Sequence, residues 1–252
     1  MDNDKFETIK RNFKNNLIEL KKDLDKYLMQ ISEIAKDFGG PSIYFHNRAL
    51  QEIKNNYLGV SHIEMIYAVL PSWGMHRMGD TSTKIINFDK FTEQIDNNRE
   101  ILHKLKDKTI SEIKIEAISN LLINNLSFSE SNSHLVSSSK VLHHIIPNLV
   151  SPIDKQYSIR FLLQPKNKFL SNTKNGKIKY SQIAYNNKEE IKYSNLFLSG
   201  MHSFIEDNKS ILINYLDKEI DFGKNFNTSL TKIFDNLIMV YIKDNSIREY
   251  GV

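Results

Sequence analysis

The sequence contains no cysteine, only five prolines and nine glycines, and a single tryptophan among its 252 residues. The absence of cysteine excludes structural disulfides, thiolate catalysis and cysteine-ligated zinc sites. No apolar run approaches the roughly 20 residues that a membrane-spanning helix needs. The first residues are polar and contain no signal-peptide core. We therefore expect a cytoplasmic protein that has no membrane partner.

The remaining composition is ordinary for a globular protein. Hydrophobic residues make up 40% of the chain and charged residues 25%, and the length is sufficient for a domain with its own core. The formal net charge of +4 suits an anionic partner such as DNA or another nucleic acid. A lysine-rich composition that reflects an AT-rich genome explains the same charge without any such partner, and both interpretations stay open.

Hydrophobic periodicity predicts a long helix at the start of the chain. From Phe13 to Phe38, apolar side chains recur at alternating intervals of four and three residues, which is a heptad stripe. Gly39-Gly40-Pro41 then ends the pattern. We expect this helix to form one wall of a helical bundle. A scaffold that dimerises through the stripe is the alternative.

Most of the remaining chain also has helical periodicity. Further helices are expected at residues 42–56, 61–70, 89–108, 110–126, 140–146, 154–163, 189–206, 208–218 and 228–243. Residues 165–182 break the pattern, and Asn175-Gly176 is typical of a hairpin turn. We therefore predict a mainly α, multi-helix globular bundle with at most one small β-hairpin near residues 166–182. A single domain over residues 1–252 is expected, with a possible subdivision near residues 165–182.

Two ionisable residues stand at expected helix starts. Serines 137–139 precede Lys140, and Pro152-Ile153 precedes Asp154. Serines at a helix start cap its amides, and such amides can also hold a phosphate. An amine at that position has a lowered pKa and can act as a nucleophile. The short connector favours proximity of Lys140 and Asp154. A plain N-cap role for Asp154 and a solvated Lys140 are the alternatives.

The same region resembles a known family of DNA-repair enzymes. The residues Ser139-Lys140-Val141-Leu142, Pro152-Ile153-Asp154 and Ile159-Arg160 resemble the core of the helix-hairpin-helix DNA glycosylases. The resemblance implies an all-helical fold, Asp154 as catalytic carboxylate, and Lys140 as phosphate contact or Schiff-base amine. Ser138, Ser139 and Arg160 are the candidate phosphate contacts. The resemblance covers about residues 130–165, and residues 134–139 replace the glycine-rich hairpin of the family.

The only tryptophan lies in a segment rich in glycine and ionisable residues, Leu70-Pro71-Ser72-Trp73-Gly74-Met75-His76-Arg77-Met78-Gly79. An enzyme that acts on an extruded base needs an aromatic surface and a polar group that contacts the base edge. Trp73 or Tyr44 would supply the surface, and His76 and Arg77 the polar group. A core plug is the alternative. The other candidate substrate contacts are His46, Lys84, His143, His144 and Tyr157.

No metal site or cofactor is expected. The adjacent His143 and His144 would point about 100° apart on a helix, so they could not ligate one ion together. The lysines from Lys166 to Lys179 fit contacts to a nucleic-acid backbone, although a solvated loop is the more common explanation of such a run. We thus predict a DNA base-excision enzyme, a glycosylase with or without lyase activity, that acts on damaged or modified bases. A non-catalytic nucleic-acid-binding helical protein, in a defence or regulatory system, is the alternative.

Overall fold

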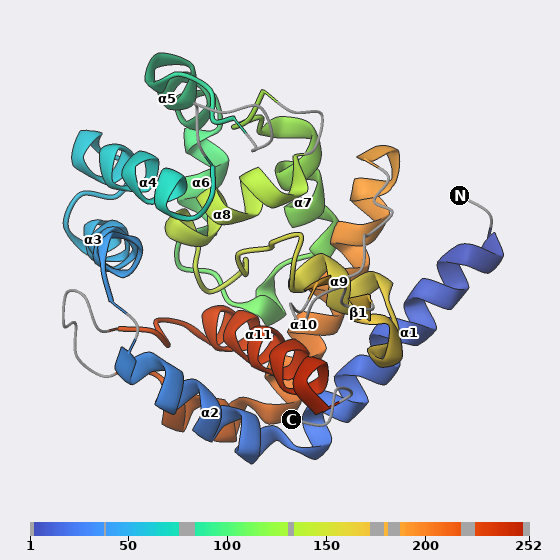
Figure 1. Cartoon of the computed structure of the whole chain (residues 1–252). Helices are drawn as coiled ribbons and strands as arrows, with labels where there is room; N and C mark the ends of the chain where they lie inside the picture. The colour runs from blue at the N-terminus through green and yellow to red at the C-terminus, as the bar shows by residue number, and fades with distance from the viewer. Residues whose placement is uncertain are drawn as a thin grey trace.

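The structure is a computed structural model that describes residues 3–37, 39–75, 84–130, 134–171, 179–180, 187–217 and 225–248. Over these ranges the chain is mainly helical, which confirms the predicted class (Figure 1). The α-helices are α1 (Asn3–Lys22), α2 (Leu24–Asp37), α3 (Pro41–Asn55), α4 (Val60–Ser72), α5 (Phe88–Asn97), α6 (Arg99–Leu105), α7 (Ile115–Asn120), α8 (Leu135–Ile145), α9 (Ser158–Leu163), α10 (Glu190–Leu212) and α11 (Leu230–Arg248). None of these described helices is long and apolar enough to cross a membrane.

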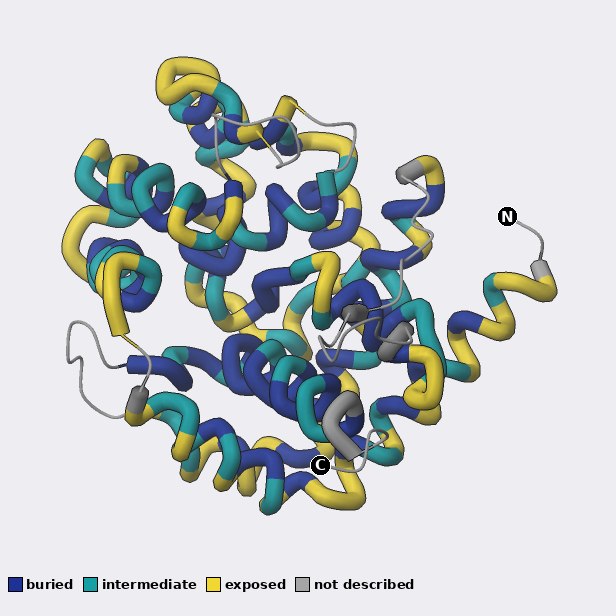
Figure 2. The backbone as a smooth tube through the Cα atoms, in the orientation of Figure 1, coloured by how far each residue is buried: buried dark blue, intermediate teal, exposed yellow. Residues whose placement is uncertain are grey.

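The helices surround a shared apolar interior. Helix α11 packs against α2, α9 and α10, while α3 packs against α4 and α8. Figure 2 shows the buried faces of the helices turned toward each other, with α11 buried along most of its described length. The buried apolar side chains form one continuous cluster. Burial of this cluster is the main force that holds the helices together.

The predicted first helix is divided in two, which corrects the expectation of one long helix. Helix α1 ends and α2 begins on either side of Asp23, where the chain changes direction sharply (Figure 1). The heptad stripe is nevertheless buried, at Phe13, Leu20, Leu24, Tyr27 and Ile31. The ring centroid of Phe13 lies 5.8 Å from that of Phe161 and 6.0 Å from that of Phe197. The stripe is therefore a wall of the core and is not available to a second copy.

Other predicted boundaries also shift. The helix expected at residues 89–108 is divided into α5 and α6. The one expected at residues 110–126 is divided into a 3-10 turn (Ile110–Glu112), α7 and a π-helical segment (Leu121–Asn125) that directly continues α7. A short antiparallel ladder pairs β1 (Leu170–Ser171) with β2 (Lys179–Tyr180), as expected for a small hairpin. The turn between them, residues 172–178 with Asn175-Gly176, lies outside the described residues.

Helices α1 and α10 approach closely at Gly200. An added Cβ there would overlap the Phe13 ring and lie 3.0 Å from Leu17 Cδ1. Glycine-to-alanine changes inside a helix normally stabilise by about 1 kcal/mol, whereas overpacking of a core costs about 1–3 kcal/mol. We expect Gly200→Ala to lower the free energy of unfolding by about 1–2 kcal/mol in urea denaturation. Gly39→Ala, at a position with nothing within 4 Å, is the control. An equal or higher midpoint for Gly200→Ala would contradict the close contact.

Candidate active site

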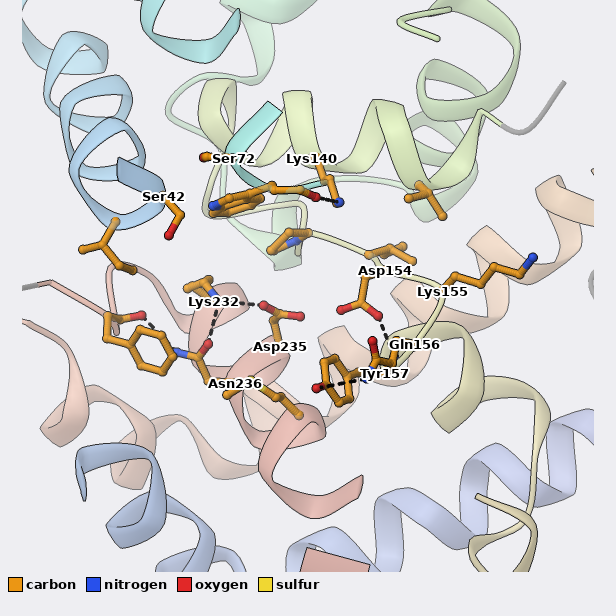
Figure 3. Close-up of a pocket in the computed structure, with 17 residues that line it drawn as sticks. Ser42, Ser72, Lys140, Asp154, Lys155, Gln156, Tyr157, Lys232, Asp235 and Asn236 are labelled. Carbon is orange, nitrogen blue, oxygen red and sulfur yellow. Dashed lines mark hydrogen bonds and ion pairs between the residues drawn. The ribbon is translucent and has the colours of Figure 1, made fainter. Parts of the chain in front are cut away.

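One pocket gathers several of the ionisable residues that the sequence singled out (Figure 3). Its volume is about 480 Å³. The start of α3, the end of α4, the middle of α8, residues 152–157 and the first turns of α11 contribute to its wall. Its polar and aromatic lining comprises Ser42, Ser72, Trp73, Lys140, Asp154, Lys155, Gln156, Tyr157, Phe226, Lys232, Asp235 and Asn236. The predicted pair, Lys140 and Asp154, thus lies in one cavity.

Lys140 lies in the middle of α8 rather than at its first turn. The helix begins at Leu135, so the expected start at residue 140 is corrected. Its Nζ donates a hydrogen bond of 2.6 Å to the carbonyl of Trp73, which ends α4. Burial lowers the pKa of the Lys140 ammonium, while the charges of Asp154 and Asp235 raise it. The side chain is therefore not the solvated lysine of the alternative interpretation.

Asp154 precedes α9, which begins at Ser158 instead of residue 154. Its Oδ1 accepts a hydrogen bond of 2.5 Å from the backbone amide of Tyr157. The carboxylate therefore caps this turn, as the alternative interpretation held, and also lines the pocket. Burial and, to a lesser extent, the charge of Asp235 raise its pKa to about 6, against the lowering effects of the Tyr157 amide and Lys140. Asp154 is thus mostly ionised at neutral pH but accepts a proton readily.

A second carboxylate in the pocket, Asp235, was not predicted. The Lys232 Nζ donates to Asp235 Oδ2 at 2.6 Å and to Asn236 Oδ1 at 2.5 Å (Figure 3). Both side chains of this pair are largely shielded from solvent, since that of Lys232 is 10% exposed and that of Asp235 is 14% exposed. The sequence indicated this arrangement, because these three polar residues lie at i, i+3 and i+4 and are followed in the helix by a run of six apolar residues, 237–242.

A row of hydrogen bonds runs behind the pocket through two histidines. His144 Nδ1 lies 2.7 Å from the carbonyl of Lys140, His144 Nε2 lies 2.9 Å from His46 Nδ1, and His46 Nε2 lies 3.0 Å from Thr228 Oγ1. A carbonyl only accepts, so His144 Nδ1 carries the hydrogen and its Nε2 accepts from His46 Nδ1. His46 Nε2 then accepts from the hydroxyl of Thr228. We call this arrangement, from Thr228 to the Lys140 carbonyl, the histidine relay.

The neighbouring His62 and His143 complete a buried cluster. His62 Nε2 donates to the carbonyl of His144 at 2.9 Å, and His143 Nδ1 donates to the carbonyl of Val150 at 2.8 Å. Burial lowers the pKa of all four histidines, to about 3 for His144 and about 4 for His62. The cluster is therefore neutral at pH 7. Among the described residues, no group of three potential ligands could hold a metal ion.

The histidines support Trp73 from behind. The Trp73 ring centroid lies 5.2 Å from that of His46, 4.8 Å from that of His144 and 6.4 Å from that of His143. These three histidines do not line the pocket, so the expectation that they contact substrate is not supported. Trp73 itself is half-buried and lines the cavity. Trp73 therefore has features of both interpretations, the core plug and the aromatic surface. One part of the ring packs on the interior, and another part faces the pocket.

The residues expected to hold a phosphate are occupied by the protein itself. The Ser138 hydroxyl donates to the carbonyl of Leu126, and the Ser139 hydroxyl donates to that of Val136. Both serines are fully buried. The amides at the start of α8 are also engaged, since the backbone N–H groups of His134 and Leu135 donate to Glu190 Oε2 at 2.9 and 3.3 Å. The phosphate site expected at this helix start is therefore not supported.

Arg160 is likewise directed inward. Its Nε donates to the carbonyl of Gln156, and one terminal nitrogen donates to Gln164 Oε1 and the carbonyl of Phe169. Of the remaining candidates, Tyr157 lines the pocket, whereas Tyr44 and Lys84 are exposed and do not. His76 and Arg77 lie outside the described residues.

Comparison of the chain with protein-family profiles, with curated proteins and with solved structures found no match. The function of the pocket is therefore argued below from its own chemistry.

Proposed function

We propose that this protein is a DNA base-excision enzyme that hydrolyses the N-glycosidic bond of a damaged or modified base bound in the pocket of Figure 3. The observation that carries the proposal is the presence of Lys140 and Asp154, each with a shifted pKa, in one cavity beside Trp73. Perturbed titratable groups in a cleft are typical of catalytic sites. The helix-hairpin-helix glycosylase-like fold implied by the resemblance belongs to the same proposal.

Asp154 would act at the sugar. Its ionised carboxylate would stabilise the positive charge that develops at C1′ as the bond to the base breaks. A pKa of about 6 also makes it a usable general base at neutral pH. It would take a proton from the attacking water as the oxygen–C1′ bond forms and the base departs with the bonding electron pair.

Lys140 would give the second, lyase form of the reaction. Its lowered pKa increases the fraction of neutral amine, the form that attacks carbon. In that case Nζ bonds to C1′, the base leaves with the electron pair of the broken bond, and Asp154 takes a proton from the amine. The sugar ring would then open: the nitrogen lone pair forms a C1′=N bond as the C1′–O4′ bond breaks, and O4′ takes a proton. The resulting Schiff base can be reduced by borohydride, which makes this step directly detectable.

Trp73 and Tyr157 would bind the extruded base. Both line the cavity, whose volume of about 480 Å³ lies within the usual range for small-ligand sites. The histidines behind Trp73 hold its ring in place, which favours a fixed stacking surface. The Lys232 ammonium would hold the Asp235 side chain in the pocket, where the charge of Asp235 raises the pKa of Asp154.

Borohydride trapping tests the proposal. Labelled DNA that carries an abasic site or one of a panel of modified bases is incubated with the wild type, Lys140→Ala and Lys104→Ala. Lys104 is an exposed lysine paired with Glu100, so it is a matched control. We expect a covalent adduct with the wild type and Lys104→Ala, and a loss of about 100-fold or more in Lys140→Ala.

The other outcomes separate the alternatives. Base release without an adduct would contradict the amine role and retain a monofunctional glycosylase that depends on Asp154. Neither adduct nor base release from any substrate, with DNA binding intact, would contradict the enzyme. It would favour the non-catalytic nucleic-acid-binding protein, for which the net charge of +4 is the supporting feature.

A further inference from the structure

A second pocket, of about 300 Å³, lies at the other end of the histidine relay. It is lined by α3, by the turn after α8 and by the segments on either side of residues 218–224. It shares no lining residue with the first pocket. Thr228, which donates to His46 in the relay, is part of its wall. The second pocket is thus a separate cavity connected to the first by hydrogen bonds.

One side chain in this wall lacks a hydrogen-bond partner. Asn47 is only 2% exposed, and within the described part of the chain its Nδ2 has no partner. An unsatisfied buried amide destabilises a protein by about 1–3 kcal/mol, so such groups are retained mainly where they serve a purpose. A ligand that supplies an acceptor, after a small rotation of the carboxamide, would satisfy this group.

The wall chemistry indicates which ligand fits. The polar lining is formed by Asn47, Gln51, Lys54, Asn148, Asp217, Asn225 and Thr228. Carboxamides pair with adjacent donors and acceptors on a base edge, and a carboxylate accepts from an exocyclic amine. Leu50, Ile53 and Pro147 add apolar surface for a ring. One exposed lysine balanced by one carboxylate does not favour a phosphate.

We propose that the second pocket binds an uncharged purine or pyrimidine, as the base or its nucleoside. This goes beyond the excision proposed for the first pocket and does not depend on it. The histidine relay connects the two pockets. A ligand that hydrogen-bonds to the Thr228 hydroxyl changes the hydrogen bond from Thr228 to His46. The ring centroid of His46 lies 5.2 Å from that of Trp73, so the change reaches the first pocket. Occupancy of the second pocket should therefore change the emission of Trp73, the only tryptophan.

Isothermal titration with adenosine and cytidine tests the site, with AMP and glucose as control ligands. We expect at least one nucleoside to bind, and its Kd to rise about tenfold or more in Asn47→Leu through loss of the amide contact. Asp154→Asn, in the first pocket, should leave this Kd within about twofold. Leucine has nearly the shape of asparagine and removes the unsatisfied amide. The melting temperature of Asn47→Leu should therefore rise by about 2–4 °C, which separates lost binding from lost folding.

Each opposite result is informative. Absence of saturable heat with both nucleosides, or an unchanged Kd in Asn47→Leu, would overturn the proposal. Loss of binding in Asp154→Asn alone would assign the heat to the first pocket and would overturn it as well. Binding without any change in Trp73 emission would overturn the connection through the relay. No arm measures catalysis, so failure here is distinguishable from failure of the excision proposal.

Discussion

Replacing Asp154 with asparagine is expected to lower the single-turnover rate of base release by about 10³-fold, a loss typical of removing a general base. Asparagine keeps an oxygen that can accept the amide hydrogen of Tyr157, so the turn before α9 should persist. The amide has neither the negative charge that stabilises a cationic sugar nor the ability to take a proton. The affinity for DNA should change by less than about threefold, because the substitution adds no bulk.

The control is Asp96→Asn, an exposed aspartate paired with Arg99, which should leave the rate unchanged. Rates are measured with enzyme in excess over a labelled duplex that carries the preferred base, so that product release does not contribute. Asp154→Asn activity within about tenfold of the wild type would remove Asp154 from the catalytic role. Asp235 would then be the remaining candidate for the catalytic carboxylate in this pocket, and the Asp235→Asn variant would test it.

Acidification below about pH 5 is expected to unfold the protein in a single steep transition. Folding lowers the pKa of four histidines, His46, His62, His143 and His144. Near pH 6.5 the unfolded chain therefore binds protons at these side chains, whereas the folded chain does not. Stability therefore falls as the pH falls, down to about pH 4 for His62 and about pH 3 for His144.

Asp154 acts in the opposite direction. Its folded-state pKa is raised to about 6 from its usual value of 3.8, so between these values the folded chain binds a proton that the unfolded chain does not. The unfolded chain binds protons at four histidines, and the folded chain binds one at Asp154, so the unfolded chain binds about three protons more. The free energy of unfolding therefore falls by about 4 kcal/mol per pH unit of acidification. Two pH units would thus remove about 8 kcal/mol, which is comparable to the stability of a typical domain.

Urea melts at pH 7, 6 and 5, followed by far-ultraviolet circular dichroism and Trp73 fluorescence, measure this slope. His62→Gln is the matched variant, because glutamine can accept from the Leu58 amide and donate to the His144 carbonyl as His62 does. We expect it to reduce the slope by about 1.4 kcal/mol per pH unit. The exposed His103, changed to glutamine, should not alter the slope. A pH-independent stability between pH 7 and 5 would contradict a neutral buried cluster.

Several features could be inferred from the sequence because they depend on neighbours in the chain. The helical class follows from apolar periodicity, and the short ladder near residues 170–180 follows from a break in that periodicity with a turn dipeptide at its centre. The placement of Lys140 and Asp154 in the same region could also be inferred, since a short connector limits how far apart they can lie. The lowered pKa of Lys140 was expected from a helix start but arises from burial.

The helix boundaries required tertiary information. The chain contains neither proline nor glycine near Asp23, so local propensity gives no reason for α1 to end there. The three serines before Lys140 are good N-cap residues, yet they lie inside α8, where each hydroxyl finds a carbonyl partner. The preference of serine for helix starts is weak. Burial of Leu135 and capping by Glu190 therefore outweigh it and move the start of α8 to residue 135.

The sequence by itself determined a helical protein, built around an apolar periodic pattern, and it singled out a lysine and an aspartate that line one pocket. Only the tertiary structure decided what surrounds them: the Lys232–Asp235 pair on α11, the histidine relay behind Trp73, and the second pocket beyond Thr228. The physical reason is distance along the chain. Periodicity and capping act over a few residues, whereas His46 meets His144 and Thr228 across 98 and 182 positions, through packing that no local pattern encodes.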